Sequence, residues 1–367
     1  MKVLRSLIYR EVILAVLYVT LAFLALFFFF DLVDEMRWVG SGNAGYTAGR
    51  ALLFVTLSIP GHLYELMPIA VLIGAIFVMA RFAQSSEFTI MRTSGMGPWL
   101  ALRTLLALGL GFVLLTVAVG DYAAPAADKF SQKLRALTGG QISSGATGAW
   151  LKEKQGEHSV AINVGGIKTP GDFLNVRIFE FGADGRILSQ INAQAAQVDE
   201  DNGQWLLQGV QATQLSQDGT KTKLSRINEA TLNWPTKVTA AMVSGALLNP
   251  DRMTTIALFQ FIRHLQANGQ AAQKYEIEFW RKVFYPLSCL VMVVLALPFA
   301  YLHFRSGGIT AYVFGGVMAG ISFFLLNNVF GYIGTLQSWW PWLAAAAPGM
   351  LYTALSLSAF GWLVLRR

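Results

Sequence analysis

The chain has 367 residues, of which 54% are hydrophobic and only 13% are charged. Apolar runs longer than a core helix needs, combined with so few charges, exclude an ordinary soluble globular protein and predict a polytopic membrane protein. The formal net charge of +7 is explained by basic residues in short loops, so it gives no support for a nucleic-acid partner.

Six stretches are apolar over the roughly 20 residues that a membrane-spanning helix requires. They lie at residues 10–30, 51–80, 99–120, 279–302, 309–334 and 341–365. The first lacks a small-residue cleavage site and is longer than a signal-peptide core, so we interpret it as a retained anchor. In the second, Pro60 and Pro68 predict a first half that is bent or interfacial, with residues 66–80 as the firmer part.

The short loops fix the expected orientation, because basic residues are retained on the cytoplasmic side. If the N-terminus is inside, the short outer loops carry two basic residues, Arg37 and Arg50. The inner segments carry nine, namely Lys2, Arg5, Arg10, Arg81, Arg92, Arg103, Arg305, Arg366 and Arg367. Both termini are therefore predicted to be cytoplasmic, and the large segment after the third span is predicted to lie outside the membrane on the opposite side.

A short amphipathic segment, QSSEFTIMRTSGMG at residues 84–97, joins the second and third apolar runs. An ionised Glu87 or Arg92 inside the bilayer would cost about 3 kcal/mol, so the segment is predicted to lie outside the hydrocarbon. Two interpretations are open: a helix that rests on the lipid headgroups, or a docking element for a cytoplasmic partner.

The same segment has the pattern of a short helix. Phe88 and Met91 are three positions apart and share one helical face. Ser85 and Ser86 are candidate N-terminal caps, and Gly95 is a candidate C-terminal end.

Residues 122–252 change to a polar composition with alternating apolar positions, which predicts strands. Turn signals recur at Asp184-Gly185, Asn202-Gly203 and Asp218-Gly219. This spacing predicts a small antiparallel sandwich or jellyroll inserted between helices 3 and 4. Residues 253–275 return to a helical pattern, so the expected order is helices 1–3 in residues 1–121, the β-domain, a helical connector, and helices 4–6 in residues 276–367.

Chemistry-bearing residues are sparse. The four histidines, at positions 62, 158, 264 and 303, do not have metal-ligand spacing, and no phosphate-binding loop of the Walker type is present. The single cysteine, Cys289, falls within the fourth apolar run. We therefore expect no catalytic residue, no metal and no cofactor in this chain.

Several stretches resemble the lipopolysaccharide-export permease family LptF/LptG of Gram-negative bacteria, most of all its LptG branch. They are SIPGHLYELMPIAVLIGAIFVMARFAQSSEFTIMRTSGM at 58–96, GDYAAPAADKFSQKLRA at 120–136, the run from LNPDRM through YEIEFWRKVFYPLSCLVMVVLALPF at 248–299, and ISFFLLNNVFGYIG at 321–334. The resemblance implies an inner-membrane permease with six helices and a periplasmic β-jellyroll.

That resemblance also implies partners. They are a homologous LptF-like permease, a cytoplasmic LptB-like ATPase dimer that binds ATP and magnesium, a bitopic LptC-like jellyroll protein, and lipopolysaccharide itself. Residues 84–97 would be the coupling helix that contacts the ATPase, with Glu87 at the family's acidic position. The implied contact residues are Ser86, Glu87, Phe88, Met91 and Arg92.

The phosphates of lipid A require cations near the outer ends of the first and fourth helices. The candidates are Arg37, Arg135, Arg281 and Lys282, of which all except Arg281 match basic positions of the family. Alternatively, Arg281 and Lys282 anchor a helix end beside Trp280. Asp31 stands where relatives carry lysine, and Gly61-His62 replaces another basic site.

Acyl chains require an apolar cavity. The candidate lining residues are Phe27, Leu32, Phe284, Phe324 and Phe330, although aromatic residues are also ordinary lipid-facing packing. Val176 and Ile178 are expected to point into an apolar groove of the jellyroll. Two other functions are possible: a non-catalytic scaffold that anchors a periplasmic bridge, and a lipid-modifying membrane enzyme.

Overall fold

The structure is a computed structural model that describes residues 2–39, 47–137, 148–169, 171–199, 202–218, 221–247, 250–301 and 309–362. The chain forms two compact units. The first, here called the helical unit, contains Met1–Glu35, Ser58–Ala124 and Glu276–Arg367, and the second, the sheet unit, contains Met36–Leu57 and Pro125–Tyr275. We describe each unit by itself.

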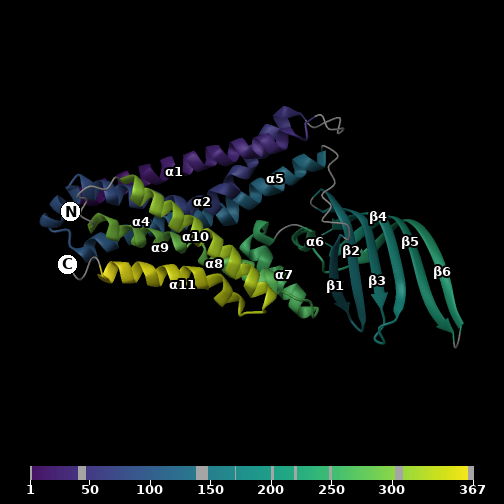
Figure 1. The fold of residues 1–367 in the computed structure, drawn as a ribbon. Helices are drawn as coiled ribbons and strands as arrows, with labels where there is room; N and C mark the ends of the chain where they lie inside the picture. Colours follow the sequence, from purple (N-terminus) through teal and green to yellow (C-terminus); the bar gives the residue numbers. More distant parts are fainter. Residues whose placement is uncertain are drawn as a thin grey trace. The chain divides into compact units, whose positions relative to one another are not determined.

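Long apolar helices account for most of the first unit (Figure 1). Five are long and apolar enough to cross a membrane, and a bent pair would make a sixth span. The helices of this unit are α1 (Lys2–Met36), α2 (Ala48–Gln84), α3 (Glu87–Thr93), α4 (Pro98–Ala118), the π-helix Val119–Ala123, α8 (Gln273–Phe284), α9 (Ser288–Ala296), the 3-10 turn Leu297–Tyr301, α10 (Ile309–Leu336) and α11 (Pro341–Phe360). Helix α5 (Ala124–Leu137) follows the π-helix and belongs to the sheet unit.

The bent pair corrects the continuous helix predicted at residues 279–302. The chain bends by 46° between α8 and the segment Ser288–Tyr301. Pro286 lies in the break, and a proline there removes a backbone donor and clashes with the carbonyl four residues earlier. The physical reason for the break was present in the sequence, although the apolar run hides it.

Helix α2 lies at the centre of the helical unit. It is one helix through Pro60 and Pro68, and its stretch between residues 66 and 80 is almost entirely buried. Glycines allow close packing on two sides: a Cβ on Gly74 would lie 2.8 Å from Val16 of α1, and Cβ atoms on Gly316 and Gly320 of α10 would lie 2.8 and 2.9 Å from Ile76 and Ile69. Both α1 and α10 therefore pack against α2 at short range.

Three contacts between residues far apart in the sequence hold together one end of the helical unit. Arg81, near the end of α2, donates to Glu11 at the start of α1 over 2.6 Å. The ring of Phe88 in α3 lies 5.0 Å from that of Tyr301, and Trp99 at the start of α4 lies 5.9 Å from Phe360 at the end of α11. The short helix α3 is thus at the end of the unit where α1 begins and α11 ends.

The sheet unit contains six antiparallel strands in one sheet, ordered β1 to β6 along the chain (Figure 1). The strands are β1 (Ala149–Gln155), β2 (His158–Thr169), β3 (Asp172–Phe181), β4 (Ile187–Asp199), β5 (Gln204–Asp218) and β6 (Lys221–Pro235). Gly185 and Gly203 have φ values of 76° and 61°, so the predicted turns at these two positions are confirmed. Gly219 lies outside the described residues.

The β region is narrower than the predicted segment 122–252. Residues 124–137 form α5, and after β6 the chain forms α6 (Ala240–Leu247) and a 3-10 turn at Pro250–Arg252. The meander of one sheet also differs from the two packed sheets of a jellyroll. The change from apolar to polar composition marks where the membrane helices end, and it does not mark where strands begin.

One face of the sheet carries its core. Leu151, Ile162, Val176 and Ile178 are each at most 2% exposed. The indole of Trp205, itself fully buried, donates to the carbonyl of Val238 over 2.9 Å. This bond ties β5 to the segment that leads into α6, which itself packs on β1 and β2.

The helix predicted after the strands is present as α7 (Thr255–Ala267). The Thr254 hydroxyl accepts from the backbone N–H of Ala257 as an N-terminal cap, and Leu258 and Leu265 are buried. Gly269, with a φ of 65°, follows its end.

Candidate functional site

The segment at residues 84–97 forms the short helix α3, with one face anchored in the helical unit. Phe88 and Met91 are each 2% exposed, as their shared face predicted, and Met96 is fully buried. The Phe88 ring packs edge-on against Tyr301 with an interplanar angle of 72°. An edge-to-face aromatic pair of this kind adds about 1 kcal/mol beyond the burial of its area, so α3 is held firmly.

The opposite face of α3 is open. Ile90 is 63% exposed, Thr89 and Thr93 are exposed, and Glu87 is partly exposed. The guanidinium of Arg92 lies 5.0 Å from the centroid of the Tyr301 ring, which is within cation–π distance. An apolar side chain beside a carboxylate on an otherwise polar surface is a suitable contact for a protein partner.

Sequence reasoning missed Ile90 and the neighbouring Trp99, which is 66% exposed. The signal was available, because Ile90 is two positions after Phe88 and therefore on the other side of a helix whose buried face Phe88 and Met91 define.

The caps of α3 only partly follow the prediction. Ser86 has a φ of 60° and its side chain makes no capping hydrogen bond, so the prediction that it caps the helix is wrong. Its backbone lies in the left-handed region, whereas a capping serine normally has an extended backbone. Gly95 has a φ of 96° and its N–H donates to the Arg92 carbonyl over 3.0 Å, so the predicted end is confirmed.

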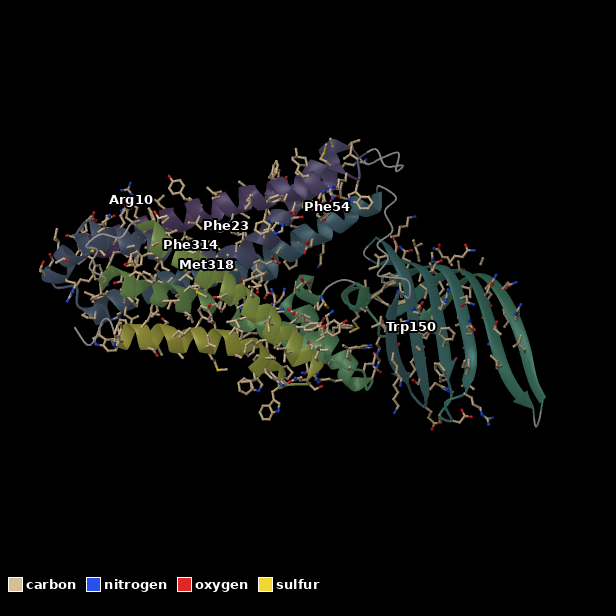
Figure 2. The ribbon with its side chains drawn as sticks, viewed as in Figure 1. Arg10, Phe23, Phe54, Trp150, Phe314 and Met318 are labelled. Atoms are coloured by element: carbon tan, nitrogen blue, oxygen red, sulfur yellow. The ribbon has the colours of Figure 1, made fainter. Side chains whose placement is uncertain are left out.

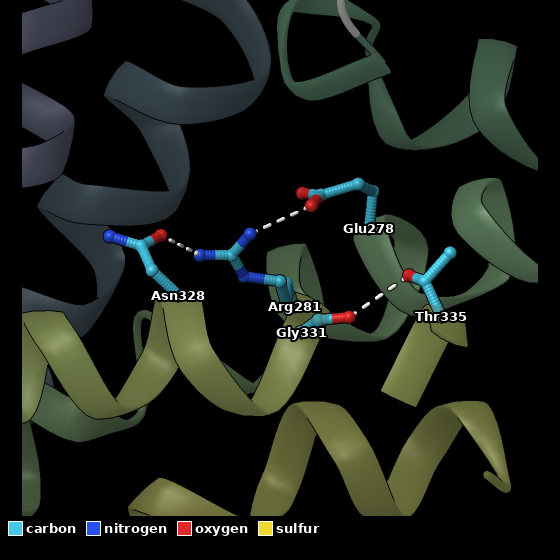
Figure 3. A network of polar contacts seen from close by, with 5 residues as sticks. All are labelled: Glu278, Arg281, Asn328, Gly331 and Thr335. Carbon is cyan, nitrogen blue, oxygen red and sulfur yellow. Dashed lines mark hydrogen bonds and ion pairs between the residues drawn. The ribbon is translucent and has the colours of Figure 1, made fainter. Parts of the chain in front are cut away.

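Arg281, a candidate for phosphate contact, already has partners within the helical unit. Figure 3 shows its guanidinium donating to Glu278 over 2.7 Å and to Asn328 of α10 over 3.0 Å. The side chains of Arg281 and Glu278 are 24% and 18% exposed. These bonds use two of the five N–H donors of the guanidinium, so an anionic ligand could bind the others while Glu278 stays in place.

The other predicted cations are placed differently. The ammonium of Lys282 lies 3.5 Å from the carbonyl oxygen of Gly120, and Arg37 is exposed in the turn after α1. Arg135 belongs to α5, but its side chain lies outside the described part of the chain. Arg281 and Lys282 are adjacent in α8 and belong to the helical unit, whereas Arg37 and Arg135 belong to the sheet unit.

Asp31 and His62, which the sequence analysis singled out, contact each other. Asp31 Oδ2 lies 2.7 Å from His62 Nε2, between α1 and α2. The ring of Phe27 stacks on the imidazole with centroids 5.0 Å apart and an interplanar angle of 21°. At this distance the carboxylate and the imidazole form an ion pair or a hydrogen bond with each other.

The predicted apolar residues lie on or near the surface of the helical unit. Phe27 and Phe324 are 37% and 38% exposed, and Leu32, Phe284 and Phe330 are partly exposed. Phe314 and Met318, on the same helix as Phe324, are 64% and 49% exposed (Figure 2). In their most apolar windows α1 is only 17% buried and α10 only 22%, so both present wide apolar surfaces.

Val176 and Ile178 alternate with exposed residues as predicted, and both are at most 2% exposed. They belong to the closed core of the sheet unit. A lipid could reach them only after the packing over this face opens.

Within the described ranges, no group of three or more His, Cys, Asp or Glu side chains could hold a metal ion. Cys289 is a free, buried thiol near the Thr116 hydroxyl, at 3.6 Å. Its surroundings are those of a packed side chain.

Comparison with known proteins gives a consistent result. The family described as lipopolysaccharide export system permease LptF/LptG matches residues 6–366. The chain is 28% identical over 337 residues to the lipopolysaccharide export system permease protein LptG of Escherichia coli K12, a match that covers 91% of this chain and 90% of that protein. The LptG protein of Haemophilus influenzae Rd is 27% identical over the same length and coverage.

Proposed function

The chain belongs to the lipopolysaccharide export permease family LptF/LptG, and from this premise we propose that it is the permease subunit of an ATP-driven transporter. The transporter extracts lipopolysaccharide from the inner membrane and passes it to a periplasmic bridge. The chain itself hydrolyses nothing. A separate ATPase dimer binds ATP and magnesium, and a homologous permease and a bitopic jellyroll protein complete the complex.

The proposal rests on one observation: α3 has one buried face and one exposed face. Its buried side chains, Phe88 and Met91, fix the helix to Tyr301 and the core of the helical unit. Its outward side offers Ile90 and Glu87 to a partner. A helix that only rested on headgroups would place its apolar residues toward the lipid, whereas here the larger apolar side chains point into the protein.

Placement of α3 also supports the proposal. It lies at the end of the helical unit where α1 begins, and the positive-inside count assigns that end to the cytoplasm. A cytoplasmic ATPase therefore reaches α3 directly.

The lipid is held by two kinds of surface. Its acyl chains lie along the apolar faces of α1 and α10, which the helical unit leaves open. Its phosphates meet Arg37, Lys282 and Arg281, and Arg281 offers them the N–H groups that its bonds to Glu278 and Asn328 do not use. Because Asp31 and His62 are paired with each other, they contribute little to phosphate binding.

Co-purification with the soluble ATPase tests the proposal. The chain and its Glu87→Lys variant are purified from cells that contain the whole export complex, and the recovered ATPase is quantified. Charge reversal at a partly exposed carboxylate in a docking surface replaces attraction by repulsion, and a loss of about tenfold or more is expected.

Glu157→Lys provides the matched control, because it makes the same change of charge at an exposed carboxylate in the turn between β1 and β2. It is expected to leave ATPase recovery unchanged. Wild-type recovery with Glu87→Lys would remove α3 from its role, and a scaffold function would then account better for the chain.

A further inference from the structure

The outer face of the sheet carries a polar groove that the proposed function does not use. It has a volume of about 850 Å³, within the range of ordinary ligand sites. Six of the side chains that line it are amides: Asn163, Asn175, Gln190, Asn192, Gln194 and Gln211. Trp150, Phe179 and Arg177 complete its functional lining. We call it the amide groove.

Strand register explains why these residues meet. Trp150, Asn163, Arg177, Asn192 and Gln211 are successive cross-strand partners in β1 to β5. Partners in a ladder lie side by side on one face of the sheet. In the adjacent row of partners, Leu151, Ile162 and Ile178 are buried in the apolar core, so the amides occupy the opposite side. Ile191 and Ala212 continue that row and are partly exposed.

Irregular backbone deepens the groove. Each of three neighbouring ladders is interrupted at one pair of residues. The missing pairs are Gly165 with Asn175, Asn175 with Gln194, and Gln194 with Gly209. Asn175 and Gly209 have φ values of 53° and 62°. A Cβ on Gly209 would lie 3.0 Å from the Gln194 amide carbon, so this glycine leaves room for that side chain to lie against the sheet.

The floor of the groove is ordered before any ligand binds. Asn163 is only 5% exposed and donates to the carbonyl of Ala149 over 3.3 Å. The side-chain amide of Gln190 donates through Nε2 to the side-chain oxygen Oδ1 of Asn192 over 3.2 Å. Fixed amides lose less conformational freedom on binding than free ones do.

An aromatic platform stands at one end. The rings of Trp150 and Phe179 are stacked with centroids 6.0 Å apart and an interplanar angle of 21°. On β2, Asn163 pairs with Trp150 and Ala161 pairs with Phe179, and the small side chain of Ala161 leaves room for the rings to meet across the strand. Trp150 is 52% exposed, and Figure 2 shows it on β1.

We propose that the amide groove binds an oligosaccharide. Each sugar hydroxyl both donates and accepts a hydrogen bond, and a primary amide offers both functions in one plane. The C–H face of a sugar ring is apolar and covers an aromatic ring such as Trp150. Among the described lining residues none is acidic and only Arg177 is basic, so neither a polycation nor a polyanion is matched.

The identity of the natural saccharide rests on the proposed function. If the chain exports lipopolysaccharide, the sugar part of that lipid is the source, and the groove holds it while the acyl chains are elsewhere. The saccharide site itself does not depend on the presence of an ATPase.

Direct titration tests the site. The full chain in lipid nanodiscs is titrated with lipid-free oligosaccharide released from bacterial lipopolysaccharide, and binding is followed by ligand-detected saturation-transfer NMR and by calorimetry. We expect a dissociation constant on the order of 1 mM or tighter. Gln211→Leu is expected to weaken binding about tenfold, because a buried hydroxyl of the sugar loses its partner.

Matched variants separate binding from folding. Gln214→Leu changes an exposed glutamine of the same strand outside the groove and is expected to bind as the wild type does. Trp150→Ala is expected to lose binding, and Trp150→Phe, which keeps a flat ring, is expected to recover most of it.

Two further probes decide between sources and ligand classes. Maltoheptaose, a neutral glucan, distinguishes a general saccharide site from one specific for the lipopolysaccharide sugar. Competition by inorganic phosphate would instead assign the groove to an anion and overturn the proposal. No binding of oligosaccharide at about 10 mM, or equal binding by Gln211→Leu and wild type, would also overturn it. Loss of ATPase recovery with Glu87→Lys leaves this titration unaffected.

Discussion

Phe88 and Ile90 lie two positions apart in α3 and have opposite surroundings. Phe88 is buried against Tyr301, and Ile90 is 63% exposed. Phe88→Ala is therefore expected to destabilise the protein by about 3 kcal/mol, mainly through the cavity it leaves. Ile90→Ala is expected to change stability by less than about 0.5 kcal/mol and yet to reduce the amount of ATPase recovered.

Thermal unfolding in detergent, followed with ATPase recovery on the same samples, measures both effects. If the Ile90→Ala variant recovers as much ATPase as the wild type, the exposed face of α3 is not the docking surface.

His264, in α7, gives the sheet unit a pH dependence. Burial lowers the pKa of its imidazole, against the smaller opposing effect of the Glu153 carboxylate. The folded state thus binds fewer protons than the unfolded state. Stability is full above the unfolded pKa of about 6.5 and declines as the pH falls below it.

The His264→Gln variant should show less of this decline. The unfolding temperature of the full chain at about pH 7.5 and about pH 5.5, for wild type and variant, measures the difference. An unchanged decline in His264→Gln would assign the dependence to other groups.

At the level of elements, the packing of α10 on α2 depends on glycine. A Cβ on Gly320 would lie 2.9 Å from Ile69, whereas one on Gly315 would meet nothing within 4 Å. Gly320→Leu is expected to destabilise the protein by about 1–3 kcal/mol, because α10 and α2 must move apart to make room for the new side chain. Gly315→Leu serves as the control, and equal stability of the two variants in thermal unfolding would contradict this packing.

The edge strand β1 is protected by the end of α7 and the residues that follow it. Asn268 and Gln270 accept hydrogen bonds from the backbone N–H groups of Lys154 and Lys152 over 2.7 and 3.0 Å. Without these acceptors the edge is open to pairing with another chain. The double variant Asn268→Ala/Gln270→Ala is expected to lose about 2 kcal/mol of stability and to self-associate.

Light scattering and thermal unfolding measure these two effects. Gln260→Ala, an exposed change on α7, is the control. A double variant that stays as stable and as monodisperse as this control would show that the edge needs no such cover.

For the whole molecule, the central prediction is topology. Ser94→Cys at the end of α3 and Glu157→Cys in the β1–β2 turn introduce exposed thiols. The native Cys289 is fully buried and is expected to be silent. A membrane-impermeant maleimide added to spheroplasts should label the Glu157→Cys variant, and should label the Ser94→Cys variant only after the membrane is permeabilised. Labelling of both from outside would contradict the cytoplasmic location of α3.

Local signals in the sequence were enough for much of this fold. Apolar runs predicted the long helices, the spacing of Phe88 and Met91 predicted the buried face of α3, and Asp184-Gly185 predicted a hairpin. Contacts between distant residues could not be predicted in this way. His62 meets Asp31, and Arg281 meets Asn328, only because helices that are separate in sequence pack together.

The same limit explains the amide groove. Asn163 and Asn192 each look like an ordinary polar residue of a strand, and neither carries a motif. Only the register of five strands places their amides in one row.

The unbroken length of α2 has a mechanical consequence. Its 37 residues extend over about 55 Å, whereas the hydrocarbon layer is about 30 Å thick. Only Ser85 and Ser86 separate the end of α2 from the start of α3. A tilt of α3 therefore rotates α2 as a rigid helix. We expect α2 to bend only at Pro60 and Pro68. Whether a movement of α3 reaches the far side of the bilayer therefore depends on how far α2 bends at these two prolines.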